Sequence, residues 1–239
     1  MPETPCTPRD LHTSRIGPTT GVGRGLLLRV VVTGIAVAVW FWTQSLIGGR
    51  ELPDAGIGDG LQNLTAGLNA YLQHSPSAAN ALLVVSSALI DAIGLFLLGT
   101  WIFAGSVRPF LGLLLLLGLR QLMQALCALP APPNMIWHYP GFPSLFVTYH
   151  VANDYFFSGH TGIAVFGAIE LARFRKNWLT VLAASVVVFE IVTVLALRAH
   201  YTMDVFTGLV AALWVVTVCE ALAPRIDSLL APASPRPVR

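Results

Sequence analysis

The chain has 239 residues, of which 55% are apolar and only 11% are charged, whereas about 25% of residues are charged in an ordinary soluble domain. With a mean hydropathy of +0.69 and a net charge of +2, the sequence has too little polar surface for a soluble globule and no basic stripe for nucleic acid. The composition therefore predicts an integral membrane protein with one bilayer domain.

The predicted elements begin after residues 1–25, which are rich in Pro, Thr and Arg and lead into no cleavage signal, so we expect a cytosolic N-terminal tail. Apolar runs of spanning length then predict six transmembrane helices. These runs cover residues 26–47, 81–103, 110–129, 159–174, 178–197 and 203–223. We therefore expect an all-α, six-span membrane domain over 26–224 and a Pro-rich cytosolic tail over 225–239.

Two segments between the spans have their own signatures. Before the second span, apolar side chains recur at helical spacing among polar ones, which predicts an amphipathic helix in the membrane interface. Residues 130–157 carry five prolines and several aromatic residues, which predicts an irregular loop folded over the helix ends. The residues of the amphipathic pattern are Leu61, Leu64, Leu68, Tyr71 and Leu72.

The distribution of cations predicts the orientation, because cytoplasmic segments carry an excess of Lys and Arg. With the N-terminus inside, eleven of the fourteen cations fall on the inner side, whereas Arg50 and Arg198 fall outside and Arg120 lies within the third span. Both termini are thus expected in the cytosol, and the 130–157 loop on the exoplasmic or periplasmic face. The inner cations are Arg9, Arg15, Arg24, Arg29, Arg108, Arg173, Arg175, Lys176, Arg225, Arg236 and Arg239.

Four of the charged residues within predicted spans need a reason, because each costs at least about 2.5 kcal/mol at a helix centre: Asp91, Arg120, Glu190 and Asp204. For Asp91 and Glu190, two explanations stay open: a polar network between helices, with the acid ionised or protonated, or a role on a substrate path. Arg120 lies about two turns from the exoplasmic end of its helix, where it can face an anion entering from outside. The fourth residue, Asp204, belongs to the pattern described next.

Two histidines carry the strongest signal. Between His160 and His200 the chain crosses the membrane and returns, so an antiparallel hairpin brings both imidazoles to the same exoplasmic level. His200 and Asp204 stand at i and i+4, which on one helix face lets the carboxylate hold a ring nitrogen. Both histidines lie near N-terminal helix ends, which favour phosphate, and Ser158 is the expected N-cap of the fourth span.

This pattern predicts phosphoryl transfer without a metal ion or another cofactor. His200 is the expected nucleophile, Asp204 raises its nucleophilicity, and His160 serves as acid for the departing alcohol and base for the incoming one. Two alternatives exist: each histidine is an interfacial residue bonded to a loop carbonyl, or the three side chains hold a zinc ion, for which no fourth ligand is visible. His138 and His150 have no partner at a defining spacing and receive no role.

At these segments the sequence resembles the lipid phosphatase and phosphotransferase (PAP2-like) superfamily, whose hallmark is a Ser-Gly-His block followed by a His-x-x-x-Asp block. Arg120 with the following residues 129–132, and residues 198–201, are similar to the plant phosphatidylcholine:diacylglycerol cholinephosphotransferases. The resemblance covers roughly residues 81–223 and implies a phospho-histidine intermediate at His200. Similarity to the sphingomyelin synthases rests on Asp154, Tyr155, Ser158, Gly159, His160, Thr161, His200, Tyr201, Thr202, Asp204 and Val205.

Departures from the phosphatase branch indicate the charge of the substrate. Two cations expected in that branch are absent, because Leu113 and Val194 stand at their positions, and Gln121 and Phe157 stand where it has prolines. A phosphodiester carries one negative charge and needs fewer cations than a phosphomonoester. Arg120 and Arg198 are therefore expected to suffice, although Arg198 has the alternative of snorkelling to the headgroup layer.

The sequence as a whole favours a phosphotransferase that moves a phosphocholine- or phosphoethanolamine-type headgroup from a glycerophospholipid to diacylglycerol or ceramide. A hydrolase of the same fold and a non-enzymatic lipid-binding protein are the alternatives, and a bacterial inner membrane suits the short tails. Asp154 is expected to orient His160, to contact a cationic headgroup or to stabilise the loop. The predicted catalytic set is His160, His200 and Asp204; the predicted substrate-binding set is Arg120, Asp154, Ser158, Arg198 and Tyr201.

Overall fold

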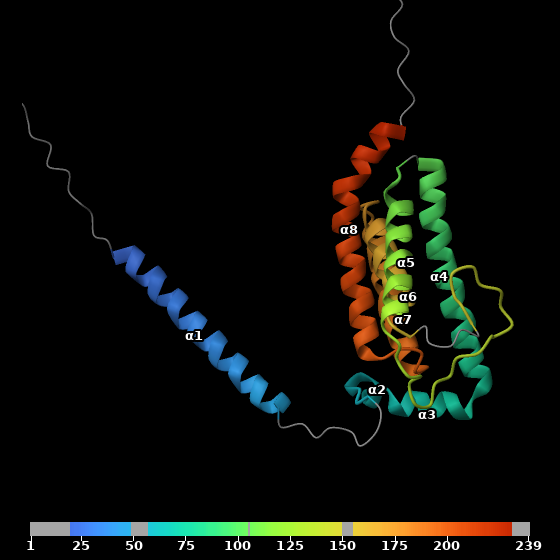
Figure 1. The fold of residues 1–239 in the computed structure, drawn as a ribbon, viewed down its shortest axis with the longest axis horizontal. Helices are drawn as coiled ribbons and strands as arrows, with labels where there is room; N and C mark the ends of the chain where they lie inside the picture. The colour runs from blue at the N-terminus through green and yellow to red at the C-terminus, as the bar shows by residue number, and fades with distance from the viewer. Residues whose placement is uncertain (1–19, 49–56, 105, 150–154, 231–239) are drawn as a thin grey trace, which may run out of the picture. The chain divides into compact units, whose positions relative to one another are not determined.

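The computed structural model describes residues 20–48, 57–104, 106–149 and 155–230, except for the side chains of 20–29, 40, 47 and 48. Regular structure in these ranges is helical, without a strand, which confirms the predicted all-α class (Figure 1). The chain divides into two compact units, residues 1–55 and 56–239. The first unit contains α1 (Thr20–Gly48), which covers the predicted first span and whose described side chains between Val30 and Leu46 are mostly apolar and exposed.

Among the described residues of the second unit, four helices are long and apolar enough to cross a membrane. They coincide with the predicted second, third, fifth and sixth spans, and their outward side chains, such as Leu95, Val188 and Trp214, are exposed and apolar. Such a surface is suited to lipid. The helices are α4 (Pro76–Ala104), α5 (Arg108–Leu126), α7 (Asn177–Ala196) and α8 (Thr202–Leu230).

The predicted fourth span is a shorter helix than expected, α6 (Gly159–Ala172). Its 14 residues rise about 21 Å, which is less than the ~30 Å hydrocarbon core of a bilayer. α6 packs against α4, α5, α7 and α8, so it forms the centre of the second unit (Figure 1). Phe166 of α6 is fully buried and packs into the space left by the missing side chain of Gly112 in α5.

The predicted amphipathic helix is two helices, α2 (Gly60–Leu64) and α3 (Ala66–His74), separated at Thr65. They lie across the end of the bundle where α6 and α8 begin (Figure 1). Polar side chains attach them there: Asn69 of α3 donates to the backbone oxygen of Ala196, and Gln62 of α2 donates to that of His200. Of the five residues of the amphipathic pattern, Leu72 is the buried one.

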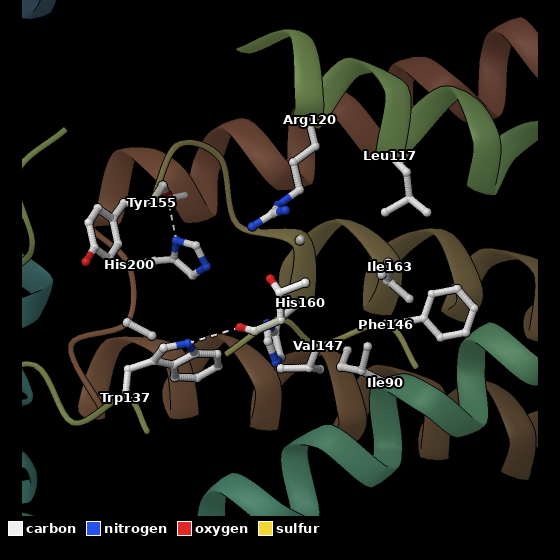
Figure 2. Close-up of a pocket in the computed structure, with 13 residues that line it drawn as sticks. Ile90, Leu117, Arg120, Trp137, Phe146, Val147, Tyr155, His160, Ile163 and His200 are labelled. Carbon is white, nitrogen blue, oxygen red and sulfur yellow. Dashed lines mark hydrogen bonds between the residues drawn. The ribbon is translucent and has the colours of Figure 1, made fainter. Parts of the chain in front are cut away.

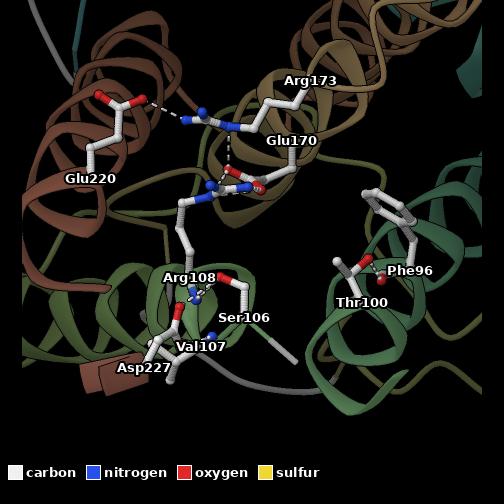
Figure 3. Close-up of polar contacts among 9 residues, drawn as sticks. All are labelled: Phe96, Thr100, Ser106, Val107, Arg108, Glu170, Arg173, Glu220 and Asp227. Atoms are coloured by element: carbon white, nitrogen blue, oxygen red, sulfur yellow. Dashed lines mark hydrogen bonds and ion pairs between the residues drawn. The ribbon is translucent and has the colours of Figure 1, made fainter. Parts of the chain in front are cut away.

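At the opposite end, ion pairs connect three helices (Figure 3). Glu170 of α6 is almost fully buried and accepts hydrogen bonds from Arg108 of α5 at 2.9–3.1 Å and from Arg173 at 3.0 Å. Arg173 also pairs with Glu220 of α8 at 2.6 Å. These contacts tie the central helix to its neighbours far from the histidines.

α8 continues beyond the predicted end of the last span near residue 223, through Pro224 to Leu230. The Asp227 carboxylate in this extension accepts hydrogen bonds from the Val107 backbone N–H at 2.7 Å and from the Ser106 hydroxyl. This contact with the start of α5 stabilises the turns that follow the proline. Residues 225–230, expected as the start of a tail, are therefore helical and contact the start of α5.

The long segment between α5 and α6 is irregular over its described residues, as predicted, and an acid within α4 holds it. Asp91 accepts hydrogen bonds from the Ser144 hydroxyl at 2.8 Å and from the backbone N–H groups of Leu145 and Phe146 at 3.0 Å. Glu190 of α7 is fully buried and accepts a hydrogen bond from Ser86 of α4 at 2.6 Å. For Glu190 the explanation by a polar contact between helices is confirmed, whereas Asp91 contacts the loop.

Candidate active site

The predicted catalytic histidines come together at one end of the bundle. His160 in the first turn of α6 and His200 just before α8 line one pocket with Arg120 of α5 (Figure 2). The expectation that a helical hairpin brings both imidazoles to the same level is thus confirmed.

The N-terminus of α6 forms one wall of this pocket. Ser158 caps the helix as predicted, because its hydroxyl oxygen accepts hydrogen bonds from the Thr161 backbone N–H at 3.3 Å and from the Thr161 hydroxyl at 3.1 Å. Ser158 is fully buried and is absent from the pocket lining. In the structure it therefore positions Gly159 and His160, and its predicted contact with substrate stays a prediction.

Arg120 lies over this first turn. Its Nε donates to the Phe157 backbone oxygen at 3.3 Å, and a Cβ at Gly159 would approach that Nε to 3.0 Å. A glycine at 159 therefore leaves room for the guanidinium beside the free N–H groups of α6. A cation and a helix N-terminus at one point favour an anion such as phosphate.

His160 is buried with a free ring nitrogen. The side chain is 7% exposed, and Nε2 has no hydrogen-bond partner among the described residues. Trp137 meets the imidazole edge-on, with ring centroids 5.5 Å apart. Buried polar atoms are usually satisfied in folded proteins, so an unpaired nitrogen in a pocket is a candidate contact for a ligand.

A hydrogen bond at Nδ1 holds the imidazole ring of His200. Nδ1 lies 2.7 Å from the backbone oxygen of Tyr155, which is the carbonyl contact considered as an alternative (Figure 2). Because a carbonyl has no proton, we assign the proton to Nδ1, which leaves the lone pair of a neutral ring on Nε2. The bond to the loop therefore leaves Nε2 able to act as a nucleophile.

The expected hydrogen bond between His200 and Asp204 on one helix face is wrong. α8 begins at Thr202, so His200 precedes the helix, and the closest approach from Nδ1 to Asp204 Oδ2 is 3.8 Å. That oxygen accepts the Tyr201 backbone N–H at 2.8 Å, while Oδ1 is buried without a partner among the described residues. At 3.8 Å, which is too long for a hydrogen bond, Asp204 can affect His200 only through its charge.

The remaining predicted substrate-binding residues are absent from the pocket lining or lie outside the described residues. Arg198 is buried and donates to the Gln62 side-chain oxygen at 2.8 Å. Tyr201 is also buried, and it lines a separate hollow beside Asp59. Burial raises the pKa of Tyr201, and the nearby Asp204, Asp59 and Tyr155 raise it further.

Residues 150–154 lie outside the described part of the chain, so nothing is added on the expectations for Asp154 and His150. His138 is exposed and is not part of the pocket lining. Within the described residues, no group of three His, Cys, Asp or Glu side chains is arranged to hold a metal ion. Catalysis without a metal stays a prediction.

Hydrogen bonds to the backbone at and next to His200 were not predicted from the sequence. The Gln62 amide donates to the His200 backbone oxygen at 3.0 Å, and Asp59 accepts from the Thr202 N–H and hydroxyl. Asp59 also caps α2 through the Gln62 backbone N–H at 3.0 Å. An acid followed three residues later by Gln is a helix-start pattern, so the cap was visible in the sequence. The contacts with residues 200 and 202 were not, because they join residues more than 130 positions apart.

Comparisons with known proteins agree with the cholinephosphotransferase part of the resemblance. The family model described as AtPDCT1/2 matches residues 59–223. A curated relative, phosphatidylcholine:diacylglycerol cholinephosphotransferase 1 of Arabidopsis thaliana, is 22% identical over 167 residues, which cover 70% of this chain and 53% of the relative. The chain thus spans about half the length of the curated relative that it matches. No solved structure matches significantly.

Proposed function

Because the chain belongs to the AtPDCT1/2 family, we propose that it is a membrane phosphotransferase that moves phosphocholine from a glycerophospholipid to diacylglycerol. The observation that carries the proposal is the shared pocket of His160, His200 and Arg120 at the N-terminus of α6. A cation, free backbone N–H groups and two imidazoles meet there, and these are the groups that transfer of a phosphodiester headgroup needs.

In the first half of the proposed reaction, His200 Nε2 attacks phosphorus and its lone pair forms a P–N bond. The bond from phosphorus to the glycerol oxygen breaks, and His160 gives a proton to that oxygen, which leaves as diacylglycerol. Arg120 and the α6 N-terminus stabilise the negative charge on the phosphoryl oxygens. Asp204, 3.8 Å from His200 Nδ1, stabilises the positive charge that the ring gains.

In the second half, the hydroxyl of an acceptor lipid gives its proton to His160 and attacks phosphorus. The P–N bond breaks, and His200 returns to its neutral form. The cycle is balanced without a metal ion, because the proton taken from one alcohol is given to the other. Water in place of the lipid hydroxyl would make the protein a hydrolase, and a ceramide hydroxyl would make it a sphingolipid synthase.

The proposal includes a topology with six membrane-crossing segments, in which α1 and α6 join the four long apolar helices. α2 and α3 then lie in the exoplasmic interface, both termini lie in the cytosol, and residues 26–224 form the catalytic membrane domain. The excess of cations on one side supports this orientation. In particular, Arg108 and Arg173 lie together at the end of the bundle that is remote from the histidines (Figure 3).

The test uses the purified chain in mixed micelles with headgroup-labelled phosphatidylcholine, supplied with diacylglycerol, with ceramide or with no acceptor. We expect label in new phosphatidylcholine when diacylglycerol is added. His200→Ala should lower this rate by at least about 10⁴-fold, since loss of a nucleophile removes the covalent step. His138→Ala is the matched control, because His138 is exposed outside the pocket lining, and it should keep the wild-type rate.

Other products would decide against the proposal. Phosphocholine released at the same rate with or without acceptor indicates a hydrolase. Label in sphingomyelin alone indicates that ceramide is the acceptor. Transfer by His200→Ala at the wild-type rate would refute the role of that histidine.

A further inference from the structure

The residues described in the pocket lining include a cationic side chain and two imidazoles for the phosphate of a lipid headgroup, but no carboxylate for a cationic group. Among its described lining residues, the nitrogen-bearing polar side chains besides the indole are Arg120, His160 and His200, and none is Asp or Glu. A zwitterionic headgroup must place its ammonium group close to its phosphate. The groups that stabilise the phosphate therefore repel the ammonium, which needs an uncharged attractive surface.

Aromatic rings supply such a surface on one side of the pocket. Trp137 and Tyr155 both line it, and in Figure 2 they lie on the His200 side of His160, whereas Ile90, Ile163 and Phe146 lie on the other. The faces of aromatic rings attract cations, Trp most strongly. The apolar side is suited to the lipid part of the donor, and the aromatic side to its headgroup.

The indole of Trp137 is fixed before any ligand binds. Its Nε1 donates to the Thr148 backbone oxygen at 3.3 Å. Its ring stacks on Tyr149 with centroids 5.1 Å apart, and the Tyr149 hydroxyl is hydrogen-bonded to Ser87 of α4 at 2.6 Å. The loop contacts with Thr148 and Tyr149 thus set the orientation of the ring, so binding costs little side-chain entropy.

We propose that Trp137 and Tyr155 form a subsite for a quaternary ammonium group and make the protein selective for choline over ethanolamine donors. This inference rests on the proposed transferase function and specifies its donor. A primary ammonium is strongly hydrated and needs hydrogen-bond acceptors when it leaves water, whereas a trimethylammonium group has no N–H to satisfy. An aromatic surface without a carboxylate therefore compensates a trimethylammonium group for its lost hydration far better than it compensates a primary ammonium.

The experiment compares three donors that share the same acyl chains: phosphatidylcholine, phosphatidylethanolamine and a phosphatidyl ester of 3,3-dimethylbutanol. The last, called the uncharged analogue because its headgroup alcohol carries no charge, has carbon in place of the quaternary nitrogen and keeps the anionic phosphate, so it separates attraction to the cation from fit of shape. We expect the wild type to use phosphatidylcholine about 30-fold better than the uncharged analogue in kcat/KM, which is about 2 kcal/mol. Trp137→Leu should lower that ratio to within about threefold of one, and Trp137→Phe should leave an intermediate ratio.

Trp101→Leu is the matched control. Trp101 also stacks on a ring, that of Phe110 at 5.6 Å, but it lies outside the pocket lining, so its loss should leave the donor ratio unchanged. An equal loss for both donors in Trp137→Leu would overturn the inference, because it would mean that Trp137 merely packs beside His160. A ratio that collapses in Asp154→Asn and not in Trp137→Leu would also overturn it and assign the cation to that carboxylate.

A binding measurement distinguishes failure of this inference from failure of the proposed function. His200→Ala protein is titrated with micellar short-chain phosphatidylcholine and with its uncharged analogue, and Trp fluorescence or NMR shifts report binding without turnover. Tighter binding of the choline lipid, lost in the additional variant Trp137→Leu, supports the subsite even if the wild type transfers nothing. Equal affinity for both lipids overturns the subsite even if transfer occurs.

Discussion

Gly208 of α8 is the position where one added methyl group should disturb the site most. A Cβ there would lie 2.5 Å from the backbone oxygen of Ser158 and 3.4 Å from the backbone nitrogen of Gly162. Backbone atoms cannot rotate away, so α6 and α8 must separate by about 1 Å to reach ordinary van der Waals contact. The hydrogen bond from the Ser158 N–H to the Asp204 backbone oxygen, now 3.0 Å, spans the same contact. Gly208→Ala should therefore move His160 relative to His200.

The expected cost is about 100-fold in transfer rate, because a misplacement of about 1 Å between catalytic groups has that effect. Overpacking should also lower the free energy of unfolding by about 1–3 kcal/mol. Both are measured on the purified protein, the rate with headgroup-labelled phosphatidylcholine and the stability by thermal unfolding in the same detergent. Gly118→Ala is the matched control: a Cβ at this position in α5 meets nothing within 4 Å, and Ala favours a helix by about 1 kcal/mol. Wild-type rate and stability in Gly208→Ala would refute the close packing of α6 on α8.

Three further substitutions test other contacts. Asp204→Asn keeps a hydrogen-bond acceptor but removes the negative charge 3.8 Å from His200. The transfer rate should fall about 10²- to 10³-fold, which corresponds to about 3–4 kcal/mol of charge interaction at an effective dielectric constant of 20. An unchanged rate would show that the charge has no role. Asp91→Asn should lower the unfolding free energy by about 1–2 kcal/mol, since an amide satisfies fewer of the N–H groups of the loop, and a wild-type melting temperature would contradict that anchor. Burial raises the pKa of Asp59, but hydrogen bonds from Thr202 and from backbone N–H groups outweigh it and hold the pKa below its ordinary value of 3.8. Ionised Asp59 therefore stabilises the fold above about pH 4, and this stabilisation is lost as the pH falls further. The difference in melting temperature between wild type and Asp59→Asn should shrink between pH 7 and pH 3. A constant difference would contradict the depressed pKa.

The helices were predictable from the sequence where a single apolar run forms a single helix. The runs near 81–103 and 178–197 became α4 and α7, because an apolar stretch of this length has few alternatives in a membrane protein. The expectations differed from the structure at helix ends. Asp227 contacts the start of α5 where α8 continues past its proline, and these residues are distant in sequence. At the break between α2 and α3 the contact is local, because the Thr65 hydroxyl donates to the Leu61 backbone oxygen.

The pairing of the two histidines was predictable, because it depends only on the direction in which the chain crosses the bundle. Alternating spans had to bring His160 and His200 to one end of the bundle, and a Ser before a helix start is a cap by local chemistry alone. The hydrogen bond expected between His200 and Asp204 was wrong because it assumed that the helix includes residue 200. Trp137 stayed hidden because its place beside His160 depends on how an irregular loop folds over the pocket.

Asp91, Arg120, Glu190 and Asp204 show why a charge within a predicted span does not by itself identify a catalytic group. Of these four residues Arg120 lines the pocket, whereas Asp91, Glu190 and Asp204 do not, and Ile90, the neighbour of Asp91, does. Asp91 instead binds the loop, and Glu190 binds Ser86 of another helix. What distinguishes the histidine site is a cation at a helix N-terminus next to two buried imidazoles that line one pocket. In this bundle, intramembrane charge is thus a sign of polar contact, and the chemistry follows from where helix ends and imidazoles meet.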